Sequence, residues 1–134
     1  MKRSKEATRL MFLLFSHTLT PLQIEDAKKS LNVEEFVYLP SNLQRIWSAI
    51  PPDIENIKDL LKPIEEFLVQ SSKKDDFVLI QGDFGATCYM VSFSKEIDLI
   101  PIYSTNKRVA KEIKKGDKLI KISEFKHLRY RRYL

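Results

Sequence analysis

Short apolar runs alternate along the chain with stretches of helical periodicity. Three of these runs, Leu10–Phe15, Phe77–Ile80 and Leu99–Tyr103, consist almost entirely of large apolar residues and lead into polar residues. Runs of this length without polar alternation indicate strands that are buried on both faces of a sheet. Two further strands are predicted at Glu35–Leu39 and Lys118–Ile122.

Apolar residues at helical spacing fill most of the intervals between these strands. Thr20, Pro21 and Gln23 form a helix start, because Thr can cap the helix, Pro suits its first position and Gln follows three residues after the cap. This helix should end near Asn32. Four more helices are expected, over residues 43–50 after a second capping pattern at 41–44, over 53–68 with a kink or break at Pro63, over 86–97 and over 109–114.

This alternation predicts the α/β class. We expect a compact, Rossmann-like, mostly parallel five-stranded sheet flanked by helices, with right-handed crossovers. A chain of 134 residues has the size of one domain, here residues 1–134 with basic tails at 1–9 and 124–134. Ligands of such sheets bind outside the carboxyl ends of the strands.

Composition limits the kinds of protein and of binding site that this chain can be. Hydrophobic residues make up 43% of the chain and charged residues 31%, which is an ordinary globular balance. The single cysteine, Cys88, excludes an intrachain disulfide, and with only His17 and His127 beside it no closed zinc set can form. No metal and no cofactor are therefore expected. The longest apolar run is too short to span a bilayer and no signal peptide is visible, so we expect a cytoplasmic protein that does not contact membranes.

The net charge of +5 is unevenly distributed. The two ends carry +7 and the body −2. A pI near 9.3 would ordinarily favour nucleic acid, but charge placed on two tails does not imply that DNA is coated, and no duplex DNA is expected as a partner. The tails are either solvated charge or surfaces for phosphate attraction or dimer contacts.

Three polar turns should meet at the carboxyl edge of a parallel sheet. The first is Ser16–Thr18, the second Gln81–Gly85 and the third Ser104–Arg108. The second turn opens a helix, so its amides can cradle an anion, and the binding residues expected there are Gly82, Asp83, Phe84, Gly85 and Thr87. The alternative is a turn that needs glycine for its own geometry. Asp83 would repel phosphate unless it pairs with Lys107 or Arg108 or binds a ribose hydroxyl.

The third turn is the more specific signal. It holds two hydroxyls, on Ser104 and Thr105, and two cations, on Lys107 and Arg108, a combination that can bind and neutralise a phosphodiester. Asn106 between them is also expected to bind the ligand. The alternative is a polar loop that caps the next helix. His17 can transfer a proton or merely hydrogen-bond at the strand end, and a Ser-His-Asp triad is not indicated because His17 has no partner visible in the sequence.

Two segments carry a resemblance to a known family. Val78–Thr87 (VLIQGDFGAT), followed by Leu99–Arg108 (LIPIYSTNKR), resembles the small stand-alone CRISPR-associated proteins of type III systems, which are related to CRISPR-associated Rossmann-fold sensor domains. The resemblance covers about residues 10–123. It implies a homodimer that binds cyclic oligoadenylate across its two-fold axis, most simply cyclic tetra-adenylate. It assigns contacts to Ser16, His17 and Thr18 and to Ser104, Thr105, Lys107 and Arg108.

Some members of that family are ring nucleases, which linearise this second messenger and switch off type III CRISPR antiviral signalling. The implied chemistry is independent of metal: the ribose 2′-hydroxyl attacks the adjacent phosphodiester and leaves a 2′,3′-cyclic phosphate. The catalytic residues expected here are His17, Lys107 and Arg108, the cations stabilising the transition state. Two alternatives stay open, a non-catalytic sensor or sponge of the same nucleotide and a nucleic-acid-associated regulator that uses the basic tails.

Overall fold

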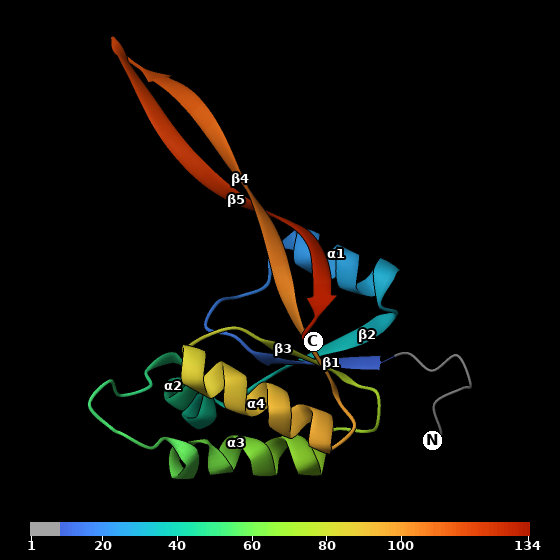
Figure 1. The fold of residues 1–134 in the computed structure, drawn as a ribbon. Coiled ribbons are helices and arrows are strands. Elements are labelled where there is room, and N and C mark those ends of the chain that lie inside the picture. The colour runs from blue at the N-terminus through green and yellow to red at the C-terminus, as the bar shows by residue number, and fades with distance from the viewer. Residues whose placement is uncertain (1–8) are drawn as a thin grey trace.

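The structure, a computed structural model, describes residues 9–134 and is built around one five-stranded sheet of order β2-β1-β3-β4-β5. Four helices accompany it, with α1 on one face of the sheet and α2, α3 and α4 on the other (Figure 1). The class is therefore α/β, as predicted. In chain order the elements are β1 (Arg9–Leu14), α1 (Pro21–Ser30), β2 (Val33–Tyr38), α2 (Ser41–Ser48), α3 (Lys58–Ser71), β3 (Phe77–Ile80), α4 (Phe84–Glu96), β4 (Ile100–Lys115) and β5 (Lys118–Arg132).

The core lies on both faces of the central strands. Alternate residues of β1 point to opposite sides, so that Phe12 and Leu14 pack under α2, α3 and α4 while Met11 and Leu13 pack under α1. All four residues of β3 are buried as well. The two continuous apolar runs are thus central strands covered on both faces, which confirms their prediction from the sequence.

The sheet is mixed, and the expectation of a mostly parallel sheet was wrong. β1 pairs in parallel with β2 and β3, and β3 pairs in parallel with β4. β5, however, pairs antiparallel with β4 over nearly its whole length, and this pairing is longer than any of the parallel ones. The cause is a tight turn where a crossover helix was expected: Gly116 adopts a φ of 65°, which glycine tolerates without strain.

The C-terminal third of the chain therefore differs from its prediction. The expected turn at 104–108 and the helix at 109–114 are both parts of β4, and the strand at 118–122 and the basic tail at 124–134 belong to β5. The two strands form a hairpin whose outer part projects from the rest of the molecule (Figure 1). The N-terminal tail lies outside the described residues except for Arg9.

The starts of the helices show which of the predicted capping patterns form. Thr20 and Gln23 form the predicted capping box at the start of α1. The similar pattern before α2 is not used, because Pro40 occupies the cap position and Gln44 donates instead to the carbonyl of Phe15. α3 begins at residue 58, later than expected, and continues through Pro63 without a break.

Within residues 9–134, no helix has the length and apolar character that crossing a bilayer requires.

Candidate functional site

Three adjoining pockets follow the carboxyl ends of the parallel strands. The first, of about 440 Å³, is lined by Gln81, Gly82, Phe84, Thr87, Tyr103 and Tyr133. The second, of about 420 Å³, shares Gln81 and Gly82 with it and adds Phe15, Ser16, His17, Asn106 and Phe125. The third, of about 190 Å³, shares Phe15, Ser16 and His17 with the second and adds Thr18, Tyr38, Leu39 and Gln44. Because neighbouring pockets share lining residues, we treat them as one surface and call it the edge groove.

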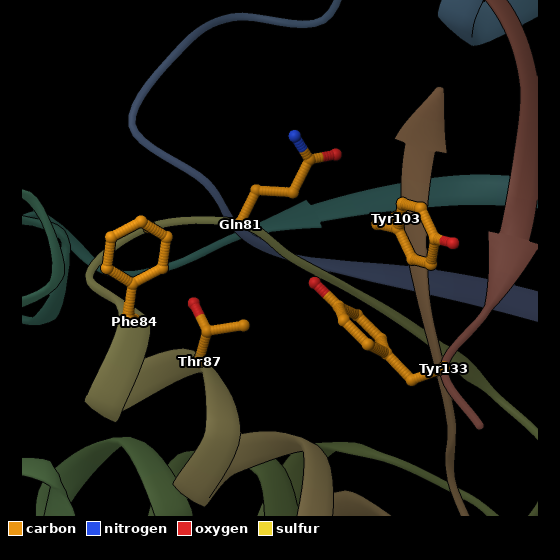
Figure 2. A pocket seen from close by; sticks show the side chains of 6 residues that line it. Gln81, Phe84, Thr87, Tyr103 and Tyr133 are labelled. Atoms are coloured by element: carbon orange, nitrogen blue, oxygen red, sulfur yellow. The ribbon is translucent and has the colours of Figure 1, made fainter. Parts of the chain in front are cut away.

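Aromatic rings form one end of the edge groove. The rings of Tyr103 and Tyr133 lie with their centroids 4.8 Å apart, and Figure 2 shows them across the pocket from Phe84 and Thr87. The Tyr133 hydroxyl donates to the carbonyl of Ile80, which fixes the C-terminal segment against the end of β3. Burial, and to a lesser extent the neighbouring Tyr103, raises the pKa of Tyr133, so its hydroxyl stays protonated at neutral pH.

A cation stands at this aromatic end. Arg131 on β5 donates through Nη1 to the Tyr103 hydroxyl at 3.2 Å, and its Cζ lies 5.7 Å from the centroid of the same ring. The sequence placed Arg131 in a basic tail, interpreted either as solvated charge or as a surface for phosphate attraction or dimer contacts. Only the antiparallel pairing of Tyr103 with Arg131 brings this guanidinium to the groove.

The glycine turn after β3 is shaped by packing. A Cβ atom at Gly82 would lie 2.9 Å from Nε1 of Trp47 on α2, which is closer than real side chains approach. That indole nitrogen donates to the carbonyl of Gln81 at 3.2 Å. Gly82 thus allows Trp47 to close the end of the core under the turn, which is the structural alternative considered for this glycine.

The start of α4 is capped from within the chain. The carboxylate of Asp83 accepts a hydrogen bond from the amide of Ala86 at 3.0 Å, and it has no contact with Lys107 or Arg108. A negative cap at the helix N-terminus opposes a second anion there, so this turn is better suited to a hydroxyl than to a phosphate. Beside it, Phe84 is 94% exposed and offers a free aromatic face.

Two of the expected binding residues near α4 differ in what they offer. Thr87 lines the groove, but its hydroxyl oxygen is buried and has no hydrogen-bond partner among residues 9–134. Gly85 lines none of the three pockets, and its nearest side-chain neighbour is the Asp83 carboxylate.

The β1 turn lies in the groove as the sequence predicted. Ser16, His17 and Thr18 are all exposed, and the His17 ring packs edge-on against Phe15 with centroids 5.3 Å apart. Asn106 from β4 lines the same pocket as His17. One pocket thus contains Ser16 and His17 of the first predicted turn, Gln81 and Gly82 of the second, and Asn106 alone from the third.

Ser104 belongs to a buried network. Only 6% of its surface is exposed, and its Oγ lies 2.5 Å from Nδ1 of His127, whose Nε2 lies 2.6 Å from Oδ2 of Asp26 on α1. Gln23 donates to the same hydroxyl at 3.3 Å. An ionised carboxylate can only accept, so Nε2 of His127 carries a proton and donates it to Asp26.

This network is a Ser-His-Asp chain that sequence reasoning missed, since His127 was assigned to a tail. Its serine lines none of the edge-groove pockets, and its ring nitrogens are used in the reverse order to a serine hydrolase. It therefore joins α1 to the hairpin and does not present a nucleophile. Burial raises the pKa of Asp26, but hydrogen bonds from Ser30 and His127 and the charges of His127 and Arg129 outweigh burial and leave that pKa below its usual value.

The remaining predicted residues lie on the hairpin. Thr105 donates to the carbonyl of Arg129, and Arg108 donates through Nε to the Ser123 hydroxyl. Because side chains alternate along a strand, Arg108 shares the face of Asn106 and Phe125, which line the groove, whereas Lys107 points to the other face. The cluster expected at 104–108 is thus divided among the core, the groove and the projecting part of the hairpin.

No metal centre is visible in the part of the chain described here: no three His, Cys, Asp or Glu side chains gather where they could hold an ion. The edge groove instead offers aromatic rings, hydroxyls and amides, with arginine at its margins. Aromatic side chains stack on nucleobases, and hydroxyls and amides recognise sugars and base edges.

Comparisons with known proteins agree on one family. The model of the "Uncharacterized protein MJ1673 family" matches residues 9–131. A relative from Methanocaldococcus jannaschii, "Uncharacterized protein MJ1673", is 60% identical over 123 residues, which cover 92% of this chain and 95% of the relative. No solved structure matches the chain.

Proposed function

This chain belongs to the MJ1673 family, and we propose that it is a ring nuclease, which binds cyclic oligoadenylate in the edge groove and linearises it. The observation that carries the proposal is the continuity of the groove. Three pockets joined by shared residues extend from Tyr133 past Gly82 to Thr18, a longer surface than a single nucleotide needs. A chain of several nucleotides fits such a groove.

The chemistry of the lining supports an adenine-rich ligand. Phe84, Tyr103 and Tyr133 supply aromatic faces on which bases can stack. Asn106 and Gln81 supply amides that can recognise base edges and ribose hydroxyls. Arg131 and Arg108 lie at the margins of the edge groove, where their guanidinium groups can bind phosphates while the bases lie inside the groove.

The reaction needs no group beyond those in the chain. The 2′-oxygen forms a bond to phosphorus while the bond from phosphorus to the 5′-oxygen breaks, and the proton of the 2′-hydroxyl is balanced by a proton delivered to the 5′-oxygen. His17 is the proton-transfer group, because it is exposed in the groove beside Asn106. Arg131 and Arg108 stabilise the charge that develops on the phosphoryl oxygens. Lys107 takes no part in this arrangement, since it points to the opposite face.

The finer features of the fold follow from the same proposal. We take the parallel part of the sheet, β2-β1-β3-β4, as a Rossmann-like core of the CRISPR-associated kind, with β5 added antiparallel. Two copies would join as a homodimer with their edge grooves around one ring. The protein would act in the cytoplasm, where the messenger is made and removed.

Incubation of the purified protein with cyclic tetra-adenylate and cyclic hexa-adenylate in EDTA tests the proposal. We expect linear products that end in a 2′,3′-cyclic phosphate, separated by chromatography and identified by mass. His17→Ala should lose most of the turnover, whereas Lys107→Ala should retain it. Rings that stay intact but bound would favour a sponge or sensor, and rings neither bound nor cleaved would overturn the proposal.

A further inference from the structure

The outer part of the β4–β5 hairpin carries the net charge of the whole chain. This segment, residues 106–126, is called the arm below; it projects from the body beyond α1 (Figure 1). The arm holds eight lysine or arginine residues against three acids, a net charge of +5 that equals the formal charge of the entire protein. The remainder of the chain is therefore neutral overall. The eight cations of the arm are Lys107, Arg108, Lys111, Lys114, Lys115, Lys118, Lys121 and Lys126.

The arm has no core of its own. Every residue from 110 to 121 is exposed, and the ribbon consists of two strands only. An isolated two-stranded ribbon is marginally stable in water, and here the cross-strand pair Ile113–Ile120 supplies one of its few apolar contacts. A segment that buries so little surface contributes little to folding. The length of the arm is therefore explained by the surface that it exposes for binding.

Within the described part of the chain, the lysines near the tip form no ion pairs, although Glu112 lies opposite Lys121 in the register and Asp117 precedes Lys118 in the turn. Lys111 pairs with Glu124 at 3.1 Å, but among residues 9–134 the four lysines around the turn have no carboxylate within ion-pair distance. Lys114 and Lys121 lie on one face of the ribbon, and Lys115 and Lys118 lie opposite each other on the other face. The tip thus presents positive charge on both sides.

We propose that the arm binds duplex DNA, with the ribbon in the major groove and the lysines on the flanking phosphates. Paired strands lie about 4.8 Å apart, and a groove about 12 Å wide admits such a ribbon with its side chains. The deep, narrow major groove of A-form RNA does not. Lysines on both faces match the two phosphate backbones that border the groove.

Lysine is the main cation of the arm, and this determines how the arm binds DNA. Seven of the eight cations are lysines, which act as flexible, hydrated point charges and lack the planar guanidinium fork of arginine. The arm therefore binds phosphates without preference for sequence. A second copy of the arm is a poor partner by comparison, because two segments of +5 each repel one another.

The tip of the arm, residues 110–121, lies apart from the edge groove, which the arm lines only through residues at its base. DNA binding by the arm reverses an expectation from the sequence. Duplex DNA was not expected because the positive charge was assigned to two tails and to the stretch from Lys107 to Lys121, an arrangement that did not imply broad coating of DNA. The hairpin gathers the lysines of this stretch on one projecting ribbon.

Fluorescence anisotropy of a labelled duplex of mixed sequence, titrated with the full-length protein at several salt concentrations, tests the proposal. The test variant is Lys114→Gln/Lys118→Gln/Lys121→Gln. The matched control is Lys28→Gln/Lys62→Gln/Lys74→Gln, which removes the same charge from exposed lysines of the body. Neither variant should change the circular dichroism spectrum.

We expect the wild type and the control to bind duplex DNA with an affinity that falls steeply with salt. In the arm variant the slope of log K against log salt should drop by about 0.9 for each lost phosphate contact, and the affinity at low salt by at least about tenfold. No binding by the wild type, equal binding by the arm variant, or a preference for duplex RNA would overturn the proposal. Self-association through the arm without DNA binding would overturn it as well.

Discussion

The imidazole of His127 bonds to the carboxylate of Asp26 at 2.6 Å, although 101 residues separate the two in the chain. The other ring nitrogen hydrogen-bonds with the Ser104 hydroxyl, so one side chain links β5, β4 and α1. The side chain of His127 is only 3% exposed. This contact explains how a hairpin with an exposed outer half is held firmly at its base.

Breaking this link should destabilise the fold. His127→Ala removes one hydrogen-bond partner from the buried Ser104 hydroxyl and one from the Asp26 carboxylate, which keep their bonds to Gln23 and Ser30, and we expect a loss of about 1–3 kcal/mol in the free energy of unfolding. Urea denaturation followed by circular dichroism measures it. Lys29→Ala, which breaks an ion pair on the solvent side of the same helix, is the control and should leave the midpoint unchanged. Equal midpoints for His127→Ala and the wild type would show that the network contributes nothing.

The same contact predicts a pH dependence. The pKa of Asp26 lies below its usual value of 3.8 in the folded protein, despite the opposing effect of burial. A carboxyl whose pKa is lowered by folding stabilises the protein above its unfolded pKa, and this contribution disappears as the pH falls through the folded pKa. The stability difference between the wild type and Asp26→Asn should therefore be constant near pH 7 and shrink below about pH 4. A difference that grows on acidification would contradict the assignment.

The two glycines of the turn before α4 should respond oppositely to alanine. At Gly82 the added Cβ would meet Trp47 at 2.9 Å, so Gly82→Ala should cost about 1–3 kcal/mol and perturb the tryptophan fluorescence. At Gly85 the nearest atom, from Asp83, lies at 3.5 Å, an ordinary contact. Gly85→Ala should be neutral or slightly stabilising in thermal denaturation. Equal effects of the two substitutions would mean that Trp47 does not limit the turn.

Arg131 should matter for turnover while its neighbour does not. Arg131→Gln removes the cation beside Tyr103, and we expect cleavage of cyclic tetra-adenylate to slow by about 10²-fold. Arg132→Gln, on the opposite face of β5 by alternation, is the control and should keep the wild-type rate. Single-turnover rates with saturating protein measure the difference. Equal rates for the two variants would remove Arg131 from the mechanism.

The central strands and the start of α1 could be predicted from the sequence because local signals there agree with the tertiary structure. Met11 and Phe12 are buried on opposite faces, as a continuous apolar run implies, and Thr20 caps α1 through the pattern that predicted it. The glycine turn and the β1 turn were correctly placed at one edge, since strand order alone brings them together.

The hairpin could not be predicted because its pattern is ambiguous. Val109 and Ile113 are four residues apart, a spacing that puts two side chains on one face of a helix and equally on one face of a strand. Only the partner strand, with Ile120 opposite Ile113, decides between the two. The roles of Arg131 and His127 depend on the same pairing, so both were missed, although the strand predicted at 118–122 forms the first part of β5.

The most direct test of the central claim is to map where the messenger binds. Titration of ¹⁵N-labelled protein carrying His17→Ala with cyclic tetra-adenylate, followed by amide chemical shifts, reports the contact surface residue by residue. We predict saturable shifts for the amides of Gly82, Phe84, Thr87 and Tyr103, with little change in the arm from residue 110 to 121. The absence of shifts, or shifts confined to the arm, would contradict a cyclic-oligoadenylate site in the edge groove.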